Sequence, residues 1–290
     1  MSRSVTVGLD ESRDSLSAAE WAAGEALSRA LPLRLVHVWN IDATAVTRLV
    51  DPDTQRKWAD NLLSSVAERL RRGHPDLQVA REHIAGEPVA DLCAVGDRSE
   101  LLVLGSRHIG TLTGFVAGSV SLAVLGRSRR PVVLVRADSP HKPQVSPPSG
   151  DVVLGLDLFD PNSDLLQFAF ACADRYGCGL RVLHTWSLPP VLGPDVAGAV
   201  TKELTDLANE RNKTLDTVLA PWTGTYPAVP VSRQVRQGRP ALDLVESSRD
   251  ARLVVVGRRN REARLGAHVG AVTHAVVHHS VAPVAVVPHD

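Results

Sequence analysis

Short apolar runs alternate along this chain with longer segments in which apolar residues recur every three or four positions. The first pattern predicts β-strands and the second predicts amphipathic helices. Residues 101–104 and 253–256 are apolar throughout, as expected for parallel strands that helices cover on both faces. The alternation indicates an α/β fold with right-handed crossovers. The expected strands are residues 4–9, 33–39, 77–84, 100–105, 132–136, 151–157, 180–186, 229–236, 252–257 and 283–288. The expected helices are residues 13–30, 52–72, 88–97, from about 119, 161–176, 198–220, 240–250 and 271–278, and the apolar face of the first contains Leu16, Ala19, Ala23 and Leu27.

Landmark residues recur in the two halves of the chain at fixed offsets. Asp10 and Asp157 lie 147 positions apart, and so do His37 and His184. Five further pairs lie 152 positions apart: Gly86 and Gly238, Pro88 and Pro240, Gly105 and Gly257, Gly118 and Gly270, and Pro131 and Pro283. One net insertion of five residues between the second strand and Gly238 reconciles the two offsets. The chain is therefore a duplication, with one domain at 1–138, a proline-rich linker at 139–150 and a second domain at 151–290.

Composition narrows the function classes. Lys and Arg number 32, as do Asp and Glu, so no net positive charge favours nucleic acid as a partner. No apolar run is long enough to cross a membrane. The first strand begins near Val5, which argues against a signal peptide, and we expect a cytoplasmic protein. Cys93, Cys172 and Cys178 form no C-x-x-C pair, which favours packed thiols over disulfides or a zinc centre.

Most other candidate chemistry lacks a complete motif. His274 and His278 have a helical i, i+4 spacing that can hold zinc, but no third ligand is evident, and we interpret them as solvent-facing or helix-end histidines. His37 and His184 interrupt buried strands at matched positions, which favours core histidines with backbone partners. The chain contains no G-x-x-x-x-G-K-[ST], G-x-G-x-x-G or G-x-S-x-G. It therefore lacks the sequence signatures of P-loop ATPases, Rossmann dehydrogenases and α/β-hydrolases.

The best candidate site lies where the order of the strands reverses, since ligands of doubly wound sheets bind beyond the carboxyl ends of the strands there. The residues expected at this edge in the first half are Asp10, Glu11, Ser12, Gly105, Ser106 and His108. A helix that begins near Ser119 aims its free amides into the same crevice, which suits an anion. Gly118 allows close approach to the backbone, and the hydroxyls of Ser119 and Ser121, on either side of Val120, can donate to phosphate. Alternatively, Gly118 only ends a loop and Ser119 only caps a helix.

These residues resemble those of the universal stress protein family, and the similarity covers nearly the whole chain as a tandem pair. ATP-binding members have an Asp at the end of strand one and G-x-x-G-(nine residues)-G-[ST] after strand four. Matching residues are Asp10, Gly105, Gly118 and Ser119 in the first half, and Asp157, Gly257 and Gly270 in the second. The pattern is broken at His108 and Asn260, which replace the second glycine, and at Ala271, which replaces the terminal hydroxyl residue; Val272 and Thr273 follow.

The resemblance implies two doubly wound domains, each with a five-stranded parallel sheet of order 3-2-1-4-5. It implies adenine near the ends of strands one and two, beside the backbone of Val38 or Thr185, and ribose and phosphates of ATP, with Mg²⁺, along the glycine loop. The family pairs its last strand across a pseudo-twofold axis. This implies that the two halves join in that way, and a homodimer of chains is also expected.

The departures from the motif favour the first half as the nucleotide site. If the second glycine requires positive φ, His108 and Asn260 are among the few residue types that tolerate it. Ala271 loses a hydroxyl, and a hydrogen bond to a charged group contributes about 1.5–3 kcal/mol. Nearby cations could offset that loss, although we interpret them as a solvated basic loop: Arg258, Arg259, Arg261 and Arg264.

The sequence therefore predicts an ATP-binding regulatory protein whose occupancy modulates a stress response through conformation or through a protein partner that the sequence does not identify. No general base is evident beside the phosphates, so we expect no enzyme, or at most a slow ATPase. Two alternatives stay open. One is a nucleotide-free dimeric scaffold, which His108, Asn260 and Ala271 favour. The other is an adenylating enzyme, for which no acceptor-substrate site is evident.

Overall fold

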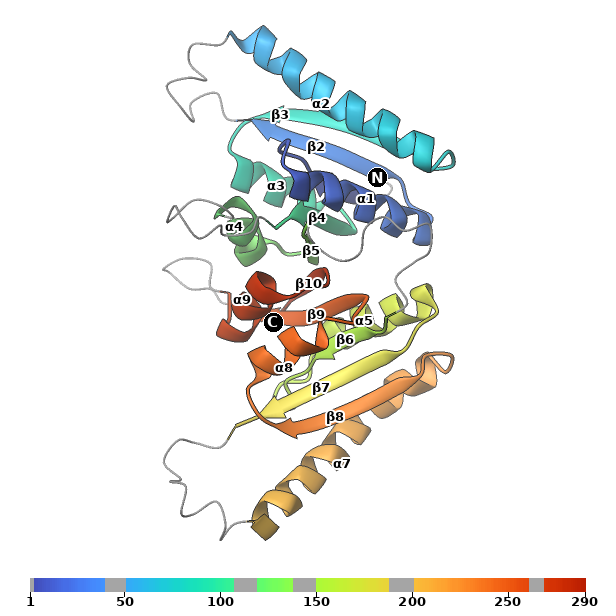
Figure 1. Ribbon diagram of the computed structural model, residues 1–290, viewed down its shortest axis with the longest axis vertical. Coiled ribbons are helices and arrows are strands. Elements are labelled where there is room, and N and C mark those ends of the chain that lie inside the picture. The colour runs from blue at the N-terminus through green and yellow to red at the C-terminus, as the bar shows by residue number, and fades with distance from the viewer. Residues whose placement is uncertain (1–2, 40–50, 107–118, 138–149, 188–200, 261–268) are drawn as a thin grey trace.

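The computed structural model describes residues 3–39, 51–106, 119–137, 150–187, 201–260 and 269–290. Its strands form one ten-stranded sheet in the order β3-β2-β1-β4-β5-β10-β9-β6-β7-β8 (Figure 1). Each half contributes five parallel strands in the expected order 3-2-1-4-5, so the predicted α/β architecture is confirmed. The part of the chain that the structure describes contains no helix able to span a membrane.

The element boundaries follow the hydrophobic pattern closely. The first half contains β1 (Val5–Gly8), α1 (Arg13–Ser28), β2 (Leu33–Trp39), α2 (Pro52–Gly73), β3 (Val79–Ala85), α3 (Pro88–Asp97), β4 (Leu101–Gly105), α4 (Ser119–Arg127) and β5 (Val132–Val135). The second half contains β6 (Val152–Gly155), α5 (Ser163–Tyr176), β7 (Leu180–Trp186), α7 (Thr201–Thr225), β8 (Val231–Gln237), α8 (Pro240–Ser247), β9 (Leu253–Arg259), α9 (Ala271–His279) and β10 (Val284–His289).

Side-chain caps explain where several helices begin. Ser12 accepts a hydrogen bond from the amide of Ser15 at the start of α1, and Asp51 accepts one from Thr54 at the start of α2. At α5, Asn162 caps the first turn, and Gly177 ends the helix in the left-handed conformation with φ of 61°. These local signals lie in the sequence, which is why the predicted boundaries agree with the structure.

Helices cover both faces of the sheet and produce two cores. One core lies under α1, α2, α5 and α7, and the other lies under α3, α4, α8 and α9. The predicted face of α1 needs one correction, because Leu27 is 38% exposed. The buried stripe is instead made of small residues that let the helix lie close to β1 and β4: Ala18, Ala19, Ala22, Ala23 and Ala26.

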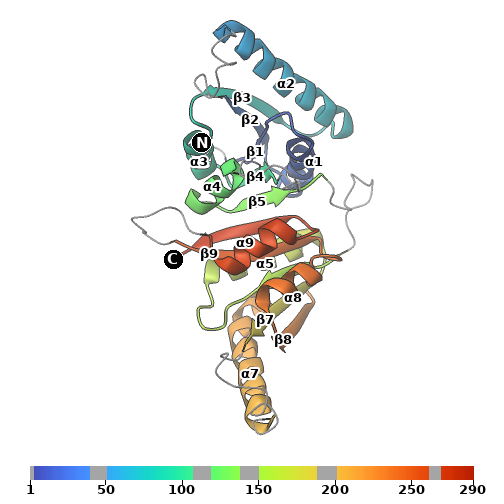
Figure 2. The ribbon, with the colours of Figure 1, turned by 60° about the vertical axis from the view of Figure 1, so that its left-hand side comes forward.

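The two halves join through their last strands, as the resemblance implied. Val133 of β5 pairs with Ala285 of β10 in an antiparallel ladder, so each strand covers the edge of the other (Figure 2). The outer edges of the sheet are β3 and β8, and the long helices α2 and α7 lie at the two ends of the molecule (Figure 1). A dimer of chains would therefore have to use a surface other than the paired edges of β5 and β10.

Two arginines, Arg258 buried and Arg136 half-buried, add contacts between the halves. Arg258 on β9 donates to the carbonyl oxygens of Gly126 and Ser128 at the C-terminal end of α4. Arg136, just after β5, donates to the carbonyl oxygens of Val277 and His278 at the end of α9. Cations at a helix C-terminus satisfy its last carbonyls and suit the negative end of its dipole. Each half thus caps a helix of the other.

Candidate functional site

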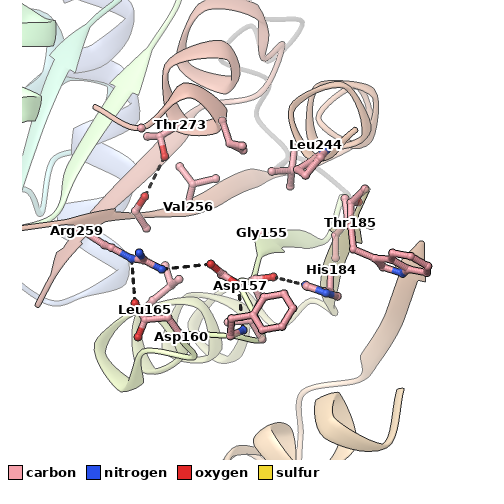
Figure 3. Close-up of a pocket in the computed structure, with 18 of the residues that line it drawn as sticks. Gly155, Asp157, Asp160, Leu165, His184, Thr185, Leu244, Val256, Arg259 and Thr273 are labelled. Carbon is pink, nitrogen blue, oxygen red and sulfur yellow. Dashed lines mark hydrogen bonds and ion pairs between the residues drawn. The ribbon is translucent and has the colours of Figure 1, made fainter. Parts of the chain in front are cut away.

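In the second half, a cavity of about 770 Å³ opens at the carboxyl ends of β6, β7 and β9 and at the N-terminus of α9 (Figure 3). This is the reversal point of the strand order, where the sequence placed the site. Figure 3 shows Thr273 on one side of the cavity and His184 and Thr185 on the other, with Asp157 between them. The predicted residues that line it are Asp157, Thr185, Gly257, Gly270, Val272 and Thr273.

The N-terminus of α9 forms one end of the cavity. Gly270 caps the helix without a side-chain hydrogen bond, and the first intrahelical bond runs from the His274 amide to the Gly270 carbonyl at 2.8 Å. The preceding amides of α9 have no partner within the helix and lie at the positive end of its dipole. A Cβ atom added at Gly270 would meet nothing within 4 Å, so a ligand can approach the backbone here. This end suits an anion.

The hydroxyls two positions beyond Ser119 and Ala271 serve the protein itself. Ser121 donates to the carbonyl oxygen of Gly105 at 2.9 Å, and Thr273 donates to that of Gly257 at the same distance. Each hydroxyl has one proton. In this structure the proton of Ser121 ties the helix to the end of the neighbouring strand, so the expected donation to phosphate would require this bond to break. Ser119 and Val120 begin α4, and His108 and Gly118 lie outside the described residues.

Gly105 and Gly257 are explained by packing. A Cβ atom at Gly105 would lie 2.6 Å from the amide nitrogen of Ser15, and one at Gly257 would lie 2.7 Å from Nε2 of His289. Such separations are far shorter than any ordinary contact. Close packing against backbone thus requires glycine at Gly105 whether or not a ligand binds, whereas at Gly257 the contact is with the ring of His289, a side chain that can move.

Arg258 and Arg259 lie in β9 and not in a solvated loop, which corrects the interpretation from sequence for these two residues. The guanidinium of Arg258 is buried, and burial lowers its pKa; it points to α4 and also donates to Oδ1 of Asn260 at 3.0 Å. Arg259 lies 3.3 Å from a carboxylate oxygen of Asp157 and 2.9 Å from one of Asp160. These two pairs are about half exposed, and such pairs contribute only about 0–1 kcal/mol each. Arg261 and Arg264 lie outside the described residues.

Asn260 continues the strand rather than forming a left-handed loop position. Its amide donates to the carbonyl oxygen of His289 at 2.6 Å, which prolongs the pairing of β9 with β10. Among the described residues other than glycine, positive φ occurs at Glu11 and Ala30. The left-handed conformation considered for Asn260 is therefore not found. Ala271 is exposed at the first position of α9.

The first half has the same frame at the end of β1. Oδ1 of Asp10 accepts from the hydroxyl of Ser12 at 2.5 Å and from its amide at 3.2 Å. Between them, Glu11 has a φ of 63°, an uncommon conformation for a residue with a side chain, and is exposed. Ser106 is buried and its amide donates to the carbonyl oxygen of Val135. Val38 lies in β2, opposite Ile84 of β3.

A cluster of rings lies at the end of the second cavity away from α9. Nδ1 of His184 is 3.0 Å from the carbonyl oxygen of Leu156, and Nε2 is 3.0 Å from Nη1 of Arg211. Because a carbonyl only accepts and a guanidinium only donates, the ring is neutral with its hydrogen on Nδ1. Burial is the largest cause that lowers the pKa of His184, and the positive charge of Arg211 also lowers it. The expected backbone partners of the paired histidines are confirmed, since Nδ1 of His37 is 2.7 Å from the carbonyl oxygen of Leu9.

Sequence reasoning missed the residues that complete this end. The guanidinium carbon of Arg211 lies 5.0 Å from the ring centre of Phe159 and 4.8 Å from that of Trp186. Phe159 is 79% exposed at the mouth of the cavity, an unusual place for a large aromatic ring. The only signal available in the sequence was an aromatic residue two positions after Asp157. Arg211 lies in the middle of the polar helix α7, and no motif or spacing in the sequence distinguishes it from the other polar residues there.

The other candidate residues, which are the histidines of α9 and two of the cysteines, lie in surroundings that explain them by packing. The rings of His274 and His278 are 4.3 Å apart, and the described part of the chain contains no group of three or more potential metal ligands. Cys172 is buried within α5 and Cys178 lies half-buried just after it, so both pack in or beside a helix as expected. Burial raises the pKa of Cys172 to about 12, which keeps the thiol unreactive.

Comparison with known proteins agrees with this architecture. The sequence model of the universal stress protein family matches residues 1–136 and 149–288. Universal stress protein Rv2005c of Mycobacterium tuberculosis is 33% identical over 289 residues, covering 97% of this chain and 96% of the relative. Rv1996 of the same organism is 32% identical over 308 residues, covering 99% and 96%. The crystal structure of a universal stress protein from Archaeoglobus fulgidus superposes with a TM-score of 0.71 over 100% of both chains at 19% identity, which shows a common fold. The chain belongs to the universal stress protein family.

Proposed function

We propose that this protein binds ATP in the crevice at the strand-reversal point of its first half and that nucleotide occupancy changes its conformation or its choice of partner. The observation that carries the proposal is the pairing of an open cavity with uncapped helix amides in the second half. The duplication gives the first half the same strands and the same helix after the loop. A helix N-terminus at such a crevice favours phosphate.

The first half is the better candidate for ATP because its motif retains a hydroxyl residue at Ser119. The carboxylate of Asp10 lies at the end of β1, where the family resemblance places the nucleoside.

Mg²⁺ would enter with the nucleotide. No three His, Cys, Asp or Glu side chains come together in the described ranges, so these residues by themselves form no cage for the ion. Mg²⁺ commonly keeps several waters and is bound through substrate phosphates with one or two carboxylates. The carboxylates present are thus compatible with a Mg²⁺ ion that is held mainly by the triphosphate. The ion would screen the negative charge of the phosphates.

The direct test is to denature the purified protein and to analyse the supernatant for adenine nucleotide by mass spectrometry, followed by calorimetric titration with ATP and Mg²⁺. We expect one tight ATP site per chain. Gly118→Glu places a side chain and a negative charge against the phosphates and should abolish that binding, whereas Gly24→Ala, on the outside of α1, should not affect it. Neither released nucleotide nor binding of added ATP would remove the proposal. Slow hydrolysis of ATP to ADP and phosphate would not contradict the proposal, because the proposed function depends on nucleotide binding and not on hydrolysis.

A nucleotide-free scaffold is the second candidate. Two observations in the second half favour it: the ion pair of Asp157 with Arg259, and the absence at Ala271 of the hydroxyl of the nucleotide motif. Under this proposal Gly118→Glu leaves partner binding unchanged, and chains associate as a homodimer through a surface other than the β5 and β10 edges. Light scattering separates a dimer from a monomer of 31.1 kDa. An adenylating enzyme would release AMP or pyrophosphate when ATP is added, and the same titration mixtures report it.

A further inference from the structure

Two hydrogen-bond donors at the inner end of the second cavity have no partner. They are the indole Nε1–H of Trp186 and the Nε–H of Arg211, and both atoms are buried among the described residues. Trp186 as a whole is 7% exposed. A buried polar group without a partner is costly, so each one calls for an explanation, of which completion by a bound molecule is one. Both groups donate and neither accepts.

The geometry also fixes the direction of the guanidinium. Nη1 of Arg211 donates to His184, and the guanidinium lies over the rings of both Phe159 and Trp186. Rotation of the planar group would break the bond to His184 and both ring contacts. With Nη1 engaged, the fork that remains for a ligand consists of Nε and Nη2. Such a fork binds two adjacent acceptor atoms in its own plane.

The first half lacks this fork although it is built in the same way. The offset of 152 that aligns the later landmarks also aligns the buried residues of α2 and α7, pairing Leu63 with Leu215 and Ala67 with Leu219. The same offset pairs Arg211 with Ala59, which is 3% exposed. The indole Nε1–H of Trp39, the counterpart of Trp186, is likewise buried without a partner. The two halves therefore differ at this position by one cationic fork.

The chemistry of the fork selects among nucleotide bases. Guanine presents two adjacent acceptors, O6 and N7, which an arginine binds through two parallel hydrogen bonds. Adenine presents N7 beside the N6 amino group, and the amino group would oppose a second donor. Because the anion end of the cavity lies at α9, a nucleotide whose phosphates bind there directs its base toward the opposite end. The ring of Phe159, which is 79% exposed at the mouth of the cavity, offers an apolar face for that base.

We propose that the cavity of the second half selects guanine nucleotides and that Arg211 is its specificity-determining residue, whereas the site proposed in the first half, with Ala59 at the matching position, accepts adenine. The proposal rests on the nucleotide-binding function proposed above. It assigns different ligands to the two halves of one chain, so the protein would respond to two nucleotides rather than to one.

The experiment titrates the full chain with GTP and Mg²⁺ in the presence of saturating ATP, and then with the nucleotides in the reverse order, by calorimetry. We expect one GTP site per chain whose affinity for GTP exceeds its affinity for ATP by roughly five- to a hundredfold, the range of one bidentate base contact. Arg211→Ala, which gives the second half the residue of the first, should remove this preference and leave the ATP site unchanged. Arg211→Lys keeps the charge but not the fork and should also lose the preference.

Arg233→Ala is the matched control. Nε of Arg233 on β8 lies 3.0 Å from Oδ1 of Asp216, which is on α7, the helix that also carries Arg211. Arg233 does not line the cavity. Its loss should leave both titrations unchanged. Thermal unfolding of each variant shows whether it is folded, and Arg211→Lys serves if the alanine variant is not. Quenching of Trp186 fluorescence by GTP, absent in Trp186→Phe, provides a second readout at the site itself.

The possible outcomes separate the two proposals. If neither nucleotide binds, the proposed function fails and this inference fails with it. If ATP binds but the second site shows no preference for GTP, only the inference is overturned. Equal losses of ATP and GTP affinity in Arg211→Ala would mean that Arg211 contacts phosphate, which also overturns it. A GTP preference that depends on Arg211, in a chain that binds no ATP, supports the inference and removes the ATP assignment of the first half.

Discussion

Tyr176 donates a 2.5 Å hydrogen bond from its phenol to the carboxylate of Glu25, joining α5 of the second half to α1 of the first. Glu25 is 3% exposed and also lies 2.6 Å from Nε of Arg29 and 3.3 Å from Nη1 of Arg175. A carboxylate so deeply buried is stable only when it is paired and hydrogen-bonded. This cluster, together with the β5–β10 ladder, holds the two halves in one body.

Removal of the charge at its centre should weaken the whole protein. Glu25→Gln removes the anion that Arg29 and Arg175 share and leaves Arg29 with only the longer 3.9 Å pair to Glu100, and we expect a loss of about 3 kcal/mol in the free energy of unfolding. Tyr176→Phe removes one charge-assisted hydrogen bond and should lose about 1.5–3 kcal/mol. Urea denaturation measures both values. Asp216→Asn, in the exposed pair with Arg233, is the control and should lie within about 0.5 kcal/mol of the parent. A Glu25→Gln value as small as that would show that the cluster does not hold the junction.

The same cluster predicts a loss of stability at alkaline pH. Burial raises the pKa of Cys172 to about 12 and that of Tyr176 well above its ordinary value of 10. In the unfolded chain the thiol loses its proton near pH 9, so above that pH the unfolded state binds fewer protons and folding stability falls. Each such group contributes a slope of about 1.4 kcal/mol per pH unit between its unfolded and folded pKa values.

Chemical denaturation at intervals between pH 8 and pH 11 tests this prediction. The decline should begin near pH 9, and it should be shallower in Cys172→Ala. Cys93 lies half-buried on α3, outside this cluster, so Cys93→Ala should retain most of the decline. A stability that stays flat to pH 11, or an unchanged slope in Cys172→Ala, would contradict the assignment.

The fold was predictable because its determinants are local and repeated. Caps such as Ser12 and Asn162, the uniformly apolar central strands, and the matched offsets each point to the same arrangement of elements. Tertiary packing decided the exceptions. The helix α7 passes through Pro221 and ends at Thr225, beyond its predicted end, and in this last part the ring of Trp222 stacks 6.1 Å from that of Phe170. That contact compensates for the amide that proline lacks.

The site was predictable only in part, since a motif names residues but not the direction of their side chains. Asp157, Gly270 and Thr273 were expected at the cavity and line it. Arg258 appeared to be a loop cation, yet it lies in a strand and points into the other half, a partner more than a hundred residues away. Arg211 belongs to the site through its ring contacts and its bond to His184, and no sequence pattern encodes such contacts.

The hydroxyls of Ser121 and Thr273 should affect stability rather than nucleotide affinity. Each donates to the carbonyl oxygen of the glycine at the end of the preceding strand. Ser121→Ala and Thr273→Val leave that carbonyl without this donor, and we expect a loss of about 1–3 kcal/mol in each case. Denaturation and ATP titration of the same samples separate the two roles. A tenfold loss of ATP affinity in Ser121→Ala with unchanged stability would show that the hydroxyl serves phosphate after all.

Two glycines of the first half should respond to alanine in opposite directions. At Gly105 a Cβ atom would press against the backbone of Asp14 and Ser15, which begins α1 and cannot rotate away, so Gly105→Ala should lose about 1–3 kcal/mol. Gly24 lies within α1 with nothing within 4 Å of its would-be Cβ, so Gly24→Ala should gain about 0.5–1 kcal/mol from helix propensity. Thermal and urea denaturation measure the pair. Equal signs would mean that α1 does not approach β4 as closely as described.

His184 should stay neutral to a lower pH than an ordinary histidine. Its burial, the largest cause, lowers its pKa below 6.5, and the positive charge of Arg211 acts in the same direction. The unfolded chain therefore takes up this proton first as the pH falls below 6.5, so the stability contributed by the neutral ring is present above that pH and is lost on acidification. The midpoint can be followed through the imidazole carbon-bound protons by NMR. Arg211→Ala removes the neighbouring charge and should raise the midpoint toward 6.5, whereas Arg233→Ala should leave it in place. A midpoint at or above 6.5 in the parent protein would contradict both the neutral tautomer and the bond from Arg211 to Nε2.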